Sequence, residues 1–358
     1  MNQNRLVIVA AEMSSSVGLS VAEVSASTLA RVMRVTEIEY CDYYHTGFRV
    51  GVVPQEHLPQ LCPALHQVAI SDRDRRMIRL AAGPLQRLIA KVPASAAPPA
   101  VYLGLPEHQT TLPINPQRLI DQIYVQAELD QSAATAKALP YGRAAGLMGI
   151  QQAAADLSSG QSEFAVVGGV DSFIDLYLLG VLEMQKRIRT DRNADGFAPG
   201  EGAGFVLMTR SETASQWGLP VLATIEGCGA GSEPGHFYSE KPYLGDGLTD
   251  AFRNCLSATD ESRLVDCVYA SFNGERYWAK EFSVAMLRHK KRFDDNCQME
   301  HPAECCGDMG AAGGAIMIGL AAHRMSRQRS SADTLVYGSS DYGQRAAVVL
   351  SSVSPGEN

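Results

Sequence analysis

Long apolar segments are missing from this sequence of 358 residues. The longest, GAAGGAIMIGLAA at 310–322, is rich in alanine and glycine and is too short to span a bilayer as a helix. The amino-terminal segment has one short apolar run after a single basic residue, which predicts a first β-strand at 5–12 rather than a secretory signal. We therefore expect no membrane span.

An excess of positive charge is also lacking, since 31 lysines and arginines stand against 39 aspartates and glutamates. The net charge of −8 provides no basic field that would attract nucleic acid or acidic lipids. The eight cysteines lack the spacing of a disulfide framework, which predicts reduced thiols in the cytoplasm. His45 and His236 have no second ligand at metal spacing, so we assign neither a metal nor a cofactor.

Short apolar runs that end at glycine or polar turns alternate along the chain with helix-like segments. Strands are predicted at residues 5–12, 99–105, 162–170, 202–210, 221–229, 264–272, 334–341 and 345–352. Helices are predicted at residues 20–34, 72–92, 115–130, 143–158, 173–186, 246–257, 277–290 and 310–325. This alternation is typical of an α/β fold with a largely parallel sheet.

Two segments rich in alanine and glycine resemble each other: GRAAGLMGIQQAAADLSSG (142–160) and GDMGAAGGAIMIGLAAHRM (307–325). Each begins at a glycine-marked turn, and small residues let a helix approach its neighbours closely. We therefore predict a duplicated fold in which both segments form buried central helices between sheets.

The run at 160–210 resembles the middle of β-ketoacyl synthases of the thiolase-like superfamily, and DGFAPGEGAG at 195–204 is its most specific motif. RLVIVAAEMSSSVG (5–18), GDMGAAGG (307–314) and LVYGSSDYGQRAAVVLS (335–351) are similar to the family's opening strand, second histidine motif and closing hairpin. The resemblance implies duplicated αβαβα layers with two mixed sheets and central buried helices. It implies an amino-terminal half, 1–235, and a carboxy-terminal half, 236–358, packed as one unit.

The family's catalytic residues are a cysteine at the start of the first central helix and two further residues, usually histidines. Counted from the adjacent motifs, the cysteine position falls on Arg143. The two histidine positions fall on Ser271 and Gly307. The resemblance therefore implies a ketosynthase fold that has lost its catalytic residues.

Arg143 requires a partner, because the start of a helix carries partial positive charge and a buried unpaired cation is costly. The resemblance puts it opposite the segment AECCGDMG, so we predict pairing with Glu304 or Asp308, with Glu275 as a third candidate. Its side chain would then fill the former acyl-cysteine pocket. Two alternatives stay open: an exposed arginine at a frayed helix start, and a site for an exogenous anion.

Replacement nucleophiles are also conceivable near the former site. Cys305 and Cys306 precede Gly307 directly, and Ser271 carries a hydroxyl, but each needs a base to activate it. His301 is the one histidine near the two cysteines in sequence.

Two further segments admit a structural or a partner-binding interpretation. The basic cluster KRIRTDR (186–192) is either a solvated face or a landing site for an acidic carrier protein. The polar and aromatic stretch at 37–49 is either edge packing or part of a partner surface.

Three functions follow from the resemblance. The first is a non-catalytic ketosynthase-like protein that acts as a scaffold, adaptor or partner subunit, as chain-length factors and stand-alone adaptors of bacterial gene clusters do. The second is an acyltransferase or 3-oxoacyl synthase-like enzyme with a rearranged site, and the third is a protein that binds an acyl or anionic ligand. The resemblance also implies a homodimer, or a heterodimer with a thiolase-fold subunit, formed through the strand that ends near GGV at 168–170.

Overall fold

The main sheet divides into two halves with the same pattern of strand directions. A computed structural model describes residues 5–42, 45–107, 113–130, 136–327 and 333–353. In it the strand order is β10-β9-β11-β12-β8-β1-β7-β6-β4-β5. The strands are β1 (Leu6–Ser15), β4 (Ala100–Gly104), β5 (Ala136–Leu139), β6 (Phe164–Ser172), β7 (Glu201–Arg210), β8 (Ala223–Ser232), β9 (Val265–Ala270), β10 (Phe293–Glu300), β11 (Asp333–Ser339) and β12 (Gln344–Ser351).

In each half two parallel pairings are followed by two antiparallel ones. β5, β4 and β6 run parallel and β7 and β1 alternate beside them, while β10, β9 and β11 run parallel and β12 and β8 alternate. A short antiparallel pairing of β1 with β8 joins the halves into one continuous sheet. The two halves meet where β1 lies beside β8; along the chain they divide between β7 and β8, upstream of residue 235.

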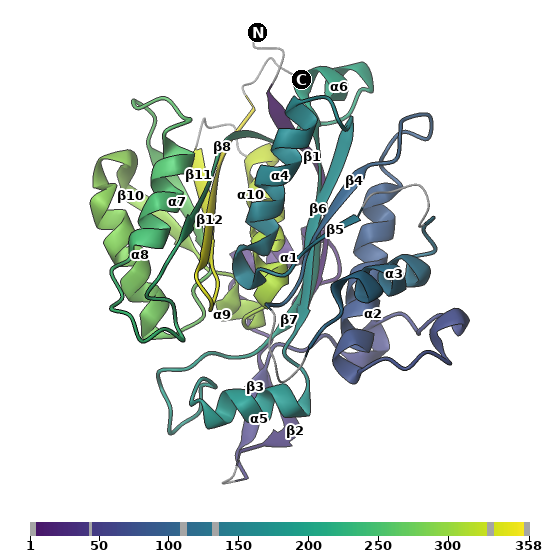
Figure 1. Ribbon diagram of the computed structural model, residues 1–358, viewed down its shortest axis with the longest axis vertical. Coiled ribbons are helices and arrows are strands. Elements are labelled where there is room, and N and C mark those ends of the chain that lie inside the picture. The colour runs from purple at the N-terminus through teal and green to yellow at the C-terminus, as the bar shows by residue number, and fades with distance from the viewer. Residues whose placement is uncertain (1–4, 43–44, 108–112, 131–135, 328–332, 354–358) are drawn as a thin grey trace.

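Two central helices, α4 (Ala145–Ser158) and α10 (Gly313–Arg327), lie between the halves (Figure 1). α4 contacts β4 and β6 on one side and β8 and β12 on the other, whereas α10 contacts β1, β7 and β11. Each follows a 3-10 turn that starts at a glycine with positive φ, 55° at Gly142 and 49° at Gly310. The predicted duplicated α/β architecture with buried central helices is confirmed. The two predicted sheets are joined into one, and that sheet is not largely parallel, because five of its nine strand pairings are antiparallel.

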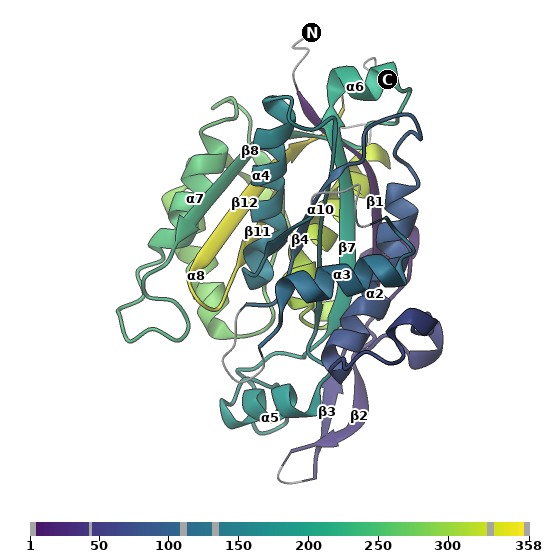
Figure 2. The same cartoon turned by 45° about the vertical axis from the view of Figure 1, so that its right-hand side comes forward.

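The outer faces of both halves are covered by further helices (Figure 2). α2 (Asp72–Ile89) and α3 (Pro116–Gln126) cover the amino-terminal half, and α7 (Asp246–Leu256) and α8 (Arg276–Arg288) cover the carboxy-terminal half. α1 (Val21–Leu29) packs on α10 and β1. The start of α2 is fixed by Ser71, whose side chain accepts a hydrogen bond from the Asp74 amide at 3.0 Å. The outer helices, the two halves of the sheet and the central helices between them form the five layers of the αβαβα arrangement.

A small satellite core lies at one end of the molecule. The hairpin of β2 (Thr36–Cys41) and β3 (Gly47–Val50) packs there against α5 (Leu176–Met184), through Phe48, Leu179 and their neighbours. The remaining short helices are η1 (Gln55–His57), η2 (Pro63–Leu65), α6 (Ser211–Gln216), η4 (Lys290–Arg292) and α9 (Ala303–Cys306). Within the described ranges, no helix is both long and apolar enough to cross a membrane.

One expectation from the resemblance is wrong. The strand that ends near GGV is β6, and its two edges are hydrogen-bonded to β4 and β7. Since both edges are occupied, a second subunit has no place to pair with this strand. The strands that end the sheet are β5 and β10.

Candidate functional site

Arg143 lies in the 3-10 turn directly before the first central helix and is 5% exposed. Its Nε donates to Asp308 Oδ2 at 2.8 Å, and its Nη1 donates to Asp341 Oδ1 at 2.7 Å. Asp308 belongs to the turn before the second central helix, and Asp341 to the turn between β11 and β12. The guanidinium thus joins the starts of both central helices to the closing hairpin of the fold.

A second buried arginine, Arg187, lies beside the first. Its Nε and Nη2 donate to the two carboxylate oxygens of Glu275, each at 2.8 Å, and its Nη1 donates to Asp341 Oδ2 at 2.6 Å. Asp341 therefore bridges two guanidiniums: its Oδ1 accepts from Arg143 Nη1 and, at 3.3 Å, from Arg187 Nη2, and its Oδ2 accepts from Arg187 Nη1. The bidentate geometry makes the Arg187 contact with Glu275 a strong charge-assisted pair.

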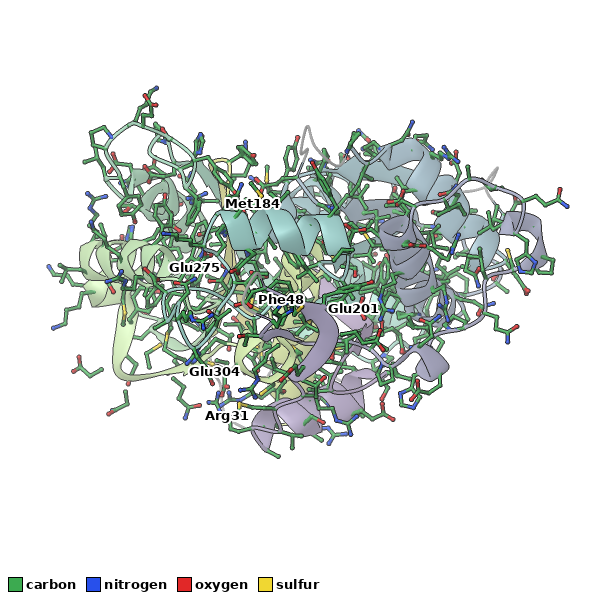
Figure 3. All side chains as sticks on the ribbon, turned by 90° about the horizontal axis from the view of Figure 1, so that it is seen from below. Arg31, Phe48, Met184, Glu201, Glu275 and Glu304 are labelled. Carbon is green, nitrogen blue, oxygen red and sulfur yellow. The ribbon has the colours of Figure 1, made fainter. Side chains whose placement is uncertain are left out.

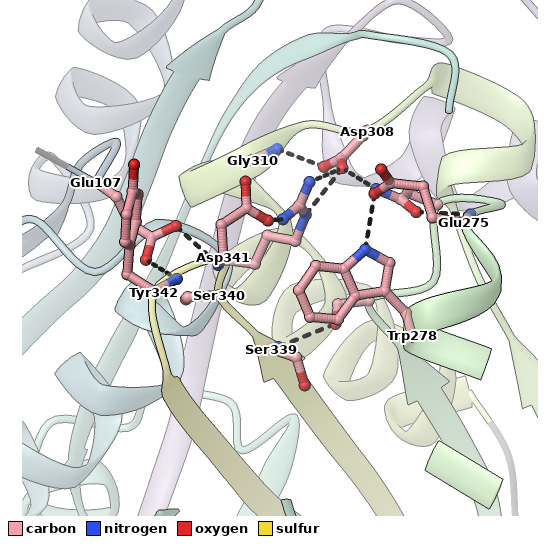
Figure 4. Close-up of polar contacts among 12 residues, drawn as sticks. Glu107, Glu275, Trp278, Asp308, Gly310, Ser339, Ser340, Asp341 and Tyr342 are labelled. Atoms are coloured by element: carbon pink, nitrogen blue, oxygen red, sulfur yellow. Dashed lines mark hydrogen bonds and ion pairs between the residues drawn. The ribbon is translucent and has the colours of Figure 1, made fainter. Parts of the chain in front are cut away.

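Neutral donors complete the coordination of the carboxylates (Figure 4). Asp308 Oδ1 accepts from the Gly310 amide at 2.9 Å, and Asn273 Nδ2 donates to both Asp308 and Glu275 at 2.9 Å. Trp278 Nε1 donates to Glu275 at 2.8 Å. Buried charges are tolerated when they are paired and hydrogen-bonded in this way.

Aromatic rings pack against the two guanidiniums. The guanidinium carbon of Arg187 lies 4.1 Å from the centroid of the Phe237 ring and 5.3 Å from that of Phe197. Arg143 lies 5.4 Å from the ring of Trp278. These cation–π contacts add attraction where the local dielectric is low.

The opposite charges of the cluster shift the pKa values of Arg143 and Asp341 so that both stay ionised. Burial alone would lower the pKa of Arg143, but Asp308 and Asp341 outweigh it and raise that pKa above its ordinary value. Burial would likewise raise the pKa of Asp341, but Arg187 and Arg143 hold it well below its ordinary value. The arginines stay charged, and Asp341 stays ionised at neutral pH.

Glu107 is a further acid at the edge of the cluster. Its carboxylate accepts from the backbone amides of Asp341 and Tyr342 at 2.9 and 3.0 Å. Burial and the charge of Asp341 raise the pKa of Glu107 to about 7. The folded protein therefore holds a proton there that the unfolded chain releases near pH 4.5.

We predict that the free energy of unfolding falls as the pH rises from about 4.5 to 7, by on the order of 3 kcal/mol, because the folded state binds the extra proton in this window. Glu107→Gln should flatten this slope. Urea unfolding of both proteins at several pH values from 5 to about 8 measures the difference. An equally steep slope in the variant would exclude Glu107 as its cause. Asp341 acts in the opposite direction, since its contribution is lost only as the pH falls below its ordinary value of 3.8.

The structure separates the three carboxylates proposed as partners of Arg143. Asp308 contacts it directly. Glu275 contacts Arg187 instead. Glu304 lies on α9, half exposed, and pairs with Arg31 at 3.2 Å, because this short helix turns the side chain outward. Glu304 is therefore outside the cluster.

The two residues to which the resemblance assigns the family's histidine positions have structural contacts. Ser271 Oγ accepts from the Ser339 amide at 3.1 Å, which joins β9 to β11. Gly307 has a φ of 74°, and a Cβ there would lie 2.7 Å from Pro199 O. A histidine at 307 would therefore require the DGFAPGEGAG segment to move.

The thiols near Gly307 are not activated. Cys306 Sγ donates to Pro302 O at 3.0 Å, and burial raises the pKa of both Cys305 and Cys306. The cavity beside Arg143 and Ser271 has a volume of about 20 Å³, which is space for roughly one water molecule. An acyl chain does not fit into it.

Arg187 and Asp341 were not predicted from the sequence as residues of the site. Arg187 belongs to the basic cluster 186–192, yet it is 2% exposed, so the solvated or carrier-binding face can include only its neighbours such as Lys186 and Arg189. Asp341 lies in the SSDYG turn, where an aspartate is ordinary in sequence. No local signal in the sequence marks either residue as part of the site.

Metal binding has no support in the described ranges, where no group of three or more histidine, cysteine, aspartate or glutamate side chains could hold an ion. His236 packs against the ring of Tyr342, with centroids 5.9 Å apart.

Comparison with known proteins identifies similar families and folds. Residues 142–214 match the family model of the beta-ketoacyl synthase amino-terminal domain. A reducing polyketide synthase of Hypomyces subiculosus is 33% identical over 146 residues, and 6-methylsalicylic acid synthase of Aspergillus niger is 31% identical over 103. These matches cover 39% and 27% of this chain but only 6% of each of those proteins.

Solved ketosynthases share the fold of the whole chain. The ishigamide ketosynthase/chain length factor has a TM-score of 0.78 at 16% identity, over 98% of this chain and 100% of that one. The ketosynthase of module 6 of the bacillaene synthase from Bacillus subtilis 168 also has a TM-score of 0.78, at 14% identity, over 98% of this chain and 72% of that one.

Proposed function

We propose that this chain, which has the ketosynthase fold of the thiolase-like superfamily, is a non-catalytic member that serves as a partner subunit or scaffold. One observation carries the proposal. Asp308 and Asp341 hold the guanidinium of Arg143, the residue to which the resemblance assigns the position of the family's nucleophilic cysteine. A cation already paired with two carboxylates can neither attack a thioester nor recruit an exogenous anion.

The rearranged enzyme is the second candidate. It would need a nucleophile and a base within hydrogen-bonding reach. Burial raises the pKa of Cys305 and Cys306, and Ser271 Oγ accepts a backbone amide hydrogen bond. His301 Nε2 contacts Glu304 on the exposed side of α9. These contacts favour the non-catalytic function.

Intact-mass measurement tests the chemical part of the proposal. The protein is incubated with acetyl and malonyl thioesters of coenzyme A and of a carrier protein, beside an active ketosynthase as positive control. We expect no acyl adduct and no release of carbon dioxide from the malonyl group. A stable adduct on Cys305, Cys306 or Ser271 would instead support the rearranged enzyme.

The partner part of the proposal requires a separate experiment. Affinity purification of the tagged chain from its native host should recover a thiolase-fold synthase subunit. Recovery of an unrelated client alone would favour the adaptor form of the scaffold. All eight cysteines are free, which supports the cytoplasm as the compartment of this interaction.

A further inference from the structure

A second buried ion pair lies beside the arginine cluster. Arg345 Nε donates to Glu281 Oε1 at 2.7 Å, and both side chains are at most 1% exposed. Arg345 belongs to β12, and Glu281 to α8, which begins directly after Glu275 of the arginine cluster (Figure 3). The ring of Trp278 lies beside both sites, with its centroid 5.4 Å from the guanidinium carbon of Arg143 and 5.5 Å from that of Arg345. The pair is therefore a neighbour of the arginine cluster.

Five buried polar atoms around this pair have no hydrogen-bond partner among the residues that the structure describes. They are Glu281 Oε2, Arg345 Nη2, Tyr337 OH, Ser339 Oγ and Tyr243 OH. Apart from Tyr243, these residues are at most 1% exposed. A folded protein seldom leaves several buried polar groups unpaired at one place, because each of them loses its hydration without compensation.

The five side chains come from different segments but are close neighbours. Burial raises the pKa of Tyr337, and the nearby Glu281 and Tyr243 raise it further. Burial also raises the pKa of Glu281, while Arg345 and Ser339 oppose that rise. Ser339 on β11 is the direct cross-strand partner of Arg345 on β12. The unpaired atoms therefore share one buried region between α8, the β11–β12 hairpin and the loop 233–245, which contains Tyr243.

We propose that this region is an internal hydration site, in which buried water molecules bridge α8, the β11–β12 hairpin and the loop 233–245. A buried water makes about three hydrogen bonds, so five unpaired atoms correspond to about two waters. The chemistry of the atoms suits water. Arg345 Nη2 can only donate, Glu281 Oε2 accepts when it is ionised, and the three hydroxyl groups can do both.

The charges at the site favour water over an ion. Arg345 and Glu281 cancel each other, so the region carries no net charge for an ion to neutralise. A cation would lie close to the guanidinium, an anion would lie close to the carboxylate, and either would add an uncompensated buried charge. An apolar ligand would leave all five atoms unpaired. A small neutral molecule that both donates and accepts is the ligand that remains.

The hydration site also supports the turn that carries Asp341. Arg345 Nη1 donates to Ser340 O at 2.6 Å, and Ser340 directly precedes Asp341. Water bound to Arg345 Nη2 holds the guanidinium in the orientation that this contact requires. The bridging waters thus stabilise the arginine cluster indirectly, through the β11–β12 turn.

A high-resolution crystal structure of the full chain tests the occupant directly. We expect ordered water within about 2.5–3.2 Å of at least three of the five atoms. A dry region, in which the five groups bond directly to one another or stay unpaired, overturns the proposal. So does an ion in place of water.

Tyr337→Phe distinguishes a water-bonded hydroxyl from an unpaired one. Loss of a water-bonded hydroxyl should raise the unfolding equilibrium constant about fivefold, whereas loss of an unpaired one should leave it unchanged or lower it. The matched control is Tyr124→Phe. Tyr124 is 3% exposed, its hydroxyl has no partner in the described part of the chain, and burial alone raises its pKa. Urea unfolding measures both changes. A rise for Tyr337→Phe no larger than that for Tyr124→Phe contradicts the proposal.

A double-mutant cycle tests whether two hydroxyls share the water. Tyr337→Phe is combined with Tyr243→Phe, and either substitution alone already breaks the shared bridge. The rise in the unfolding equilibrium constant of the double variant should therefore be at least about threefold smaller than the product of the single effects. The effects of Tyr337→Phe and Tyr124→Phe should simply multiply. Simple multiplication in the first pair would exclude a shared site. Neither experiment involves acyl transfer or a partner protein, so its failure leaves the proposed non-catalytic function untouched.

Discussion

Arg187→Met is expected to lower the free energy of unfolding by about 3–5 kcal/mol, because it leaves buried carboxylates without their cation. Glu275 would lose both of its charge-assisted contacts with the guanidinium, and Asp341 would lose one of its two arginines. Methionine keeps much of the side-chain volume, so the loss of stability measures the effect of removing the charge more than that of altered packing. Urea unfolding at neutral pH provides the measurement.

The matched control for this substitution is Arg276→Met. Arg276 pairs with Asp195 at 2.7 Å, but its side chain is 86% exposed, so water and salt screen the pair. We expect a change of at most about 1 kcal/mol there. The loss for Arg187→Met should also shrink towards pH 5, where protonation relieves the stranded acids. A loss no larger than the control's would mean that the cluster does not stabilise the fold.

The fold could be predicted from sequence because its signals are local. The motif DGFAPGEGAG leads into β7, where close backbone packing leaves no room for larger residues, and the two alanine- and glycine-rich segments become α4 and α10. The strands that were missed are short or exposed. β5 has four residues, and β10, with the sequence FDDNCQME, is largely polar, so neither has the apolar pattern of a buried strand.

The site could be predicted only in part, because its partners come together from distant segments. The position of Arg143 followed from the adjacent motif, and Asp308 from the segment that faces it. Asp341 is 198 residues from Arg143, and Arg187 lies in a cluster whose composition is typical of a solvated surface. Nothing local marks a single arginine among basic neighbours as buried, since burial depends on the tertiary packing of Phe197 and Phe237 around it.

The ionic cluster lies where the resemblance predicts a reaction centre, and it links five separate segments of the chain. It joins the start of α4, the turn before α10, the hairpin β11–β12, the start of α8 and the chain after α5. Each ion pair forms only when both of its segments are correctly placed, so the cluster stabilises one arrangement of the two halves. This is a property that a partner subunit or scaffold needs.

Arg143→Cys restores the residue type that the family uses, yet we expect neither acylation nor a reactive thiol. The introduced thiol would lie beside Asp308 and Asp341, whose negative charges raise the pKa of a neighbouring thiol and disfavour the thiolate. Ser271 and Gly307 would still provide no histidine for the oxyanion or the malonyl group. Loss of the buried cation should also cost about 3–5 kcal/mol of stability.

Two measurements on Arg143→Cys separate the effect of a raised thiol pKa from the effect of the missing histidines. Alkylation rates across a range of pH report the pKa of the introduced thiol, and intact mass after incubation with acyl-coenzyme A reports acylation. In the triple variant with Asp308→Asn and Asp341→Asn, alkylation at neutral pH should be faster, because the two charges are gone. Acylation should remain absent, since an oxyanion site and a base are still missing. Rapid acylation of Arg143→Cys alone would mean that the catalytic environment is intact.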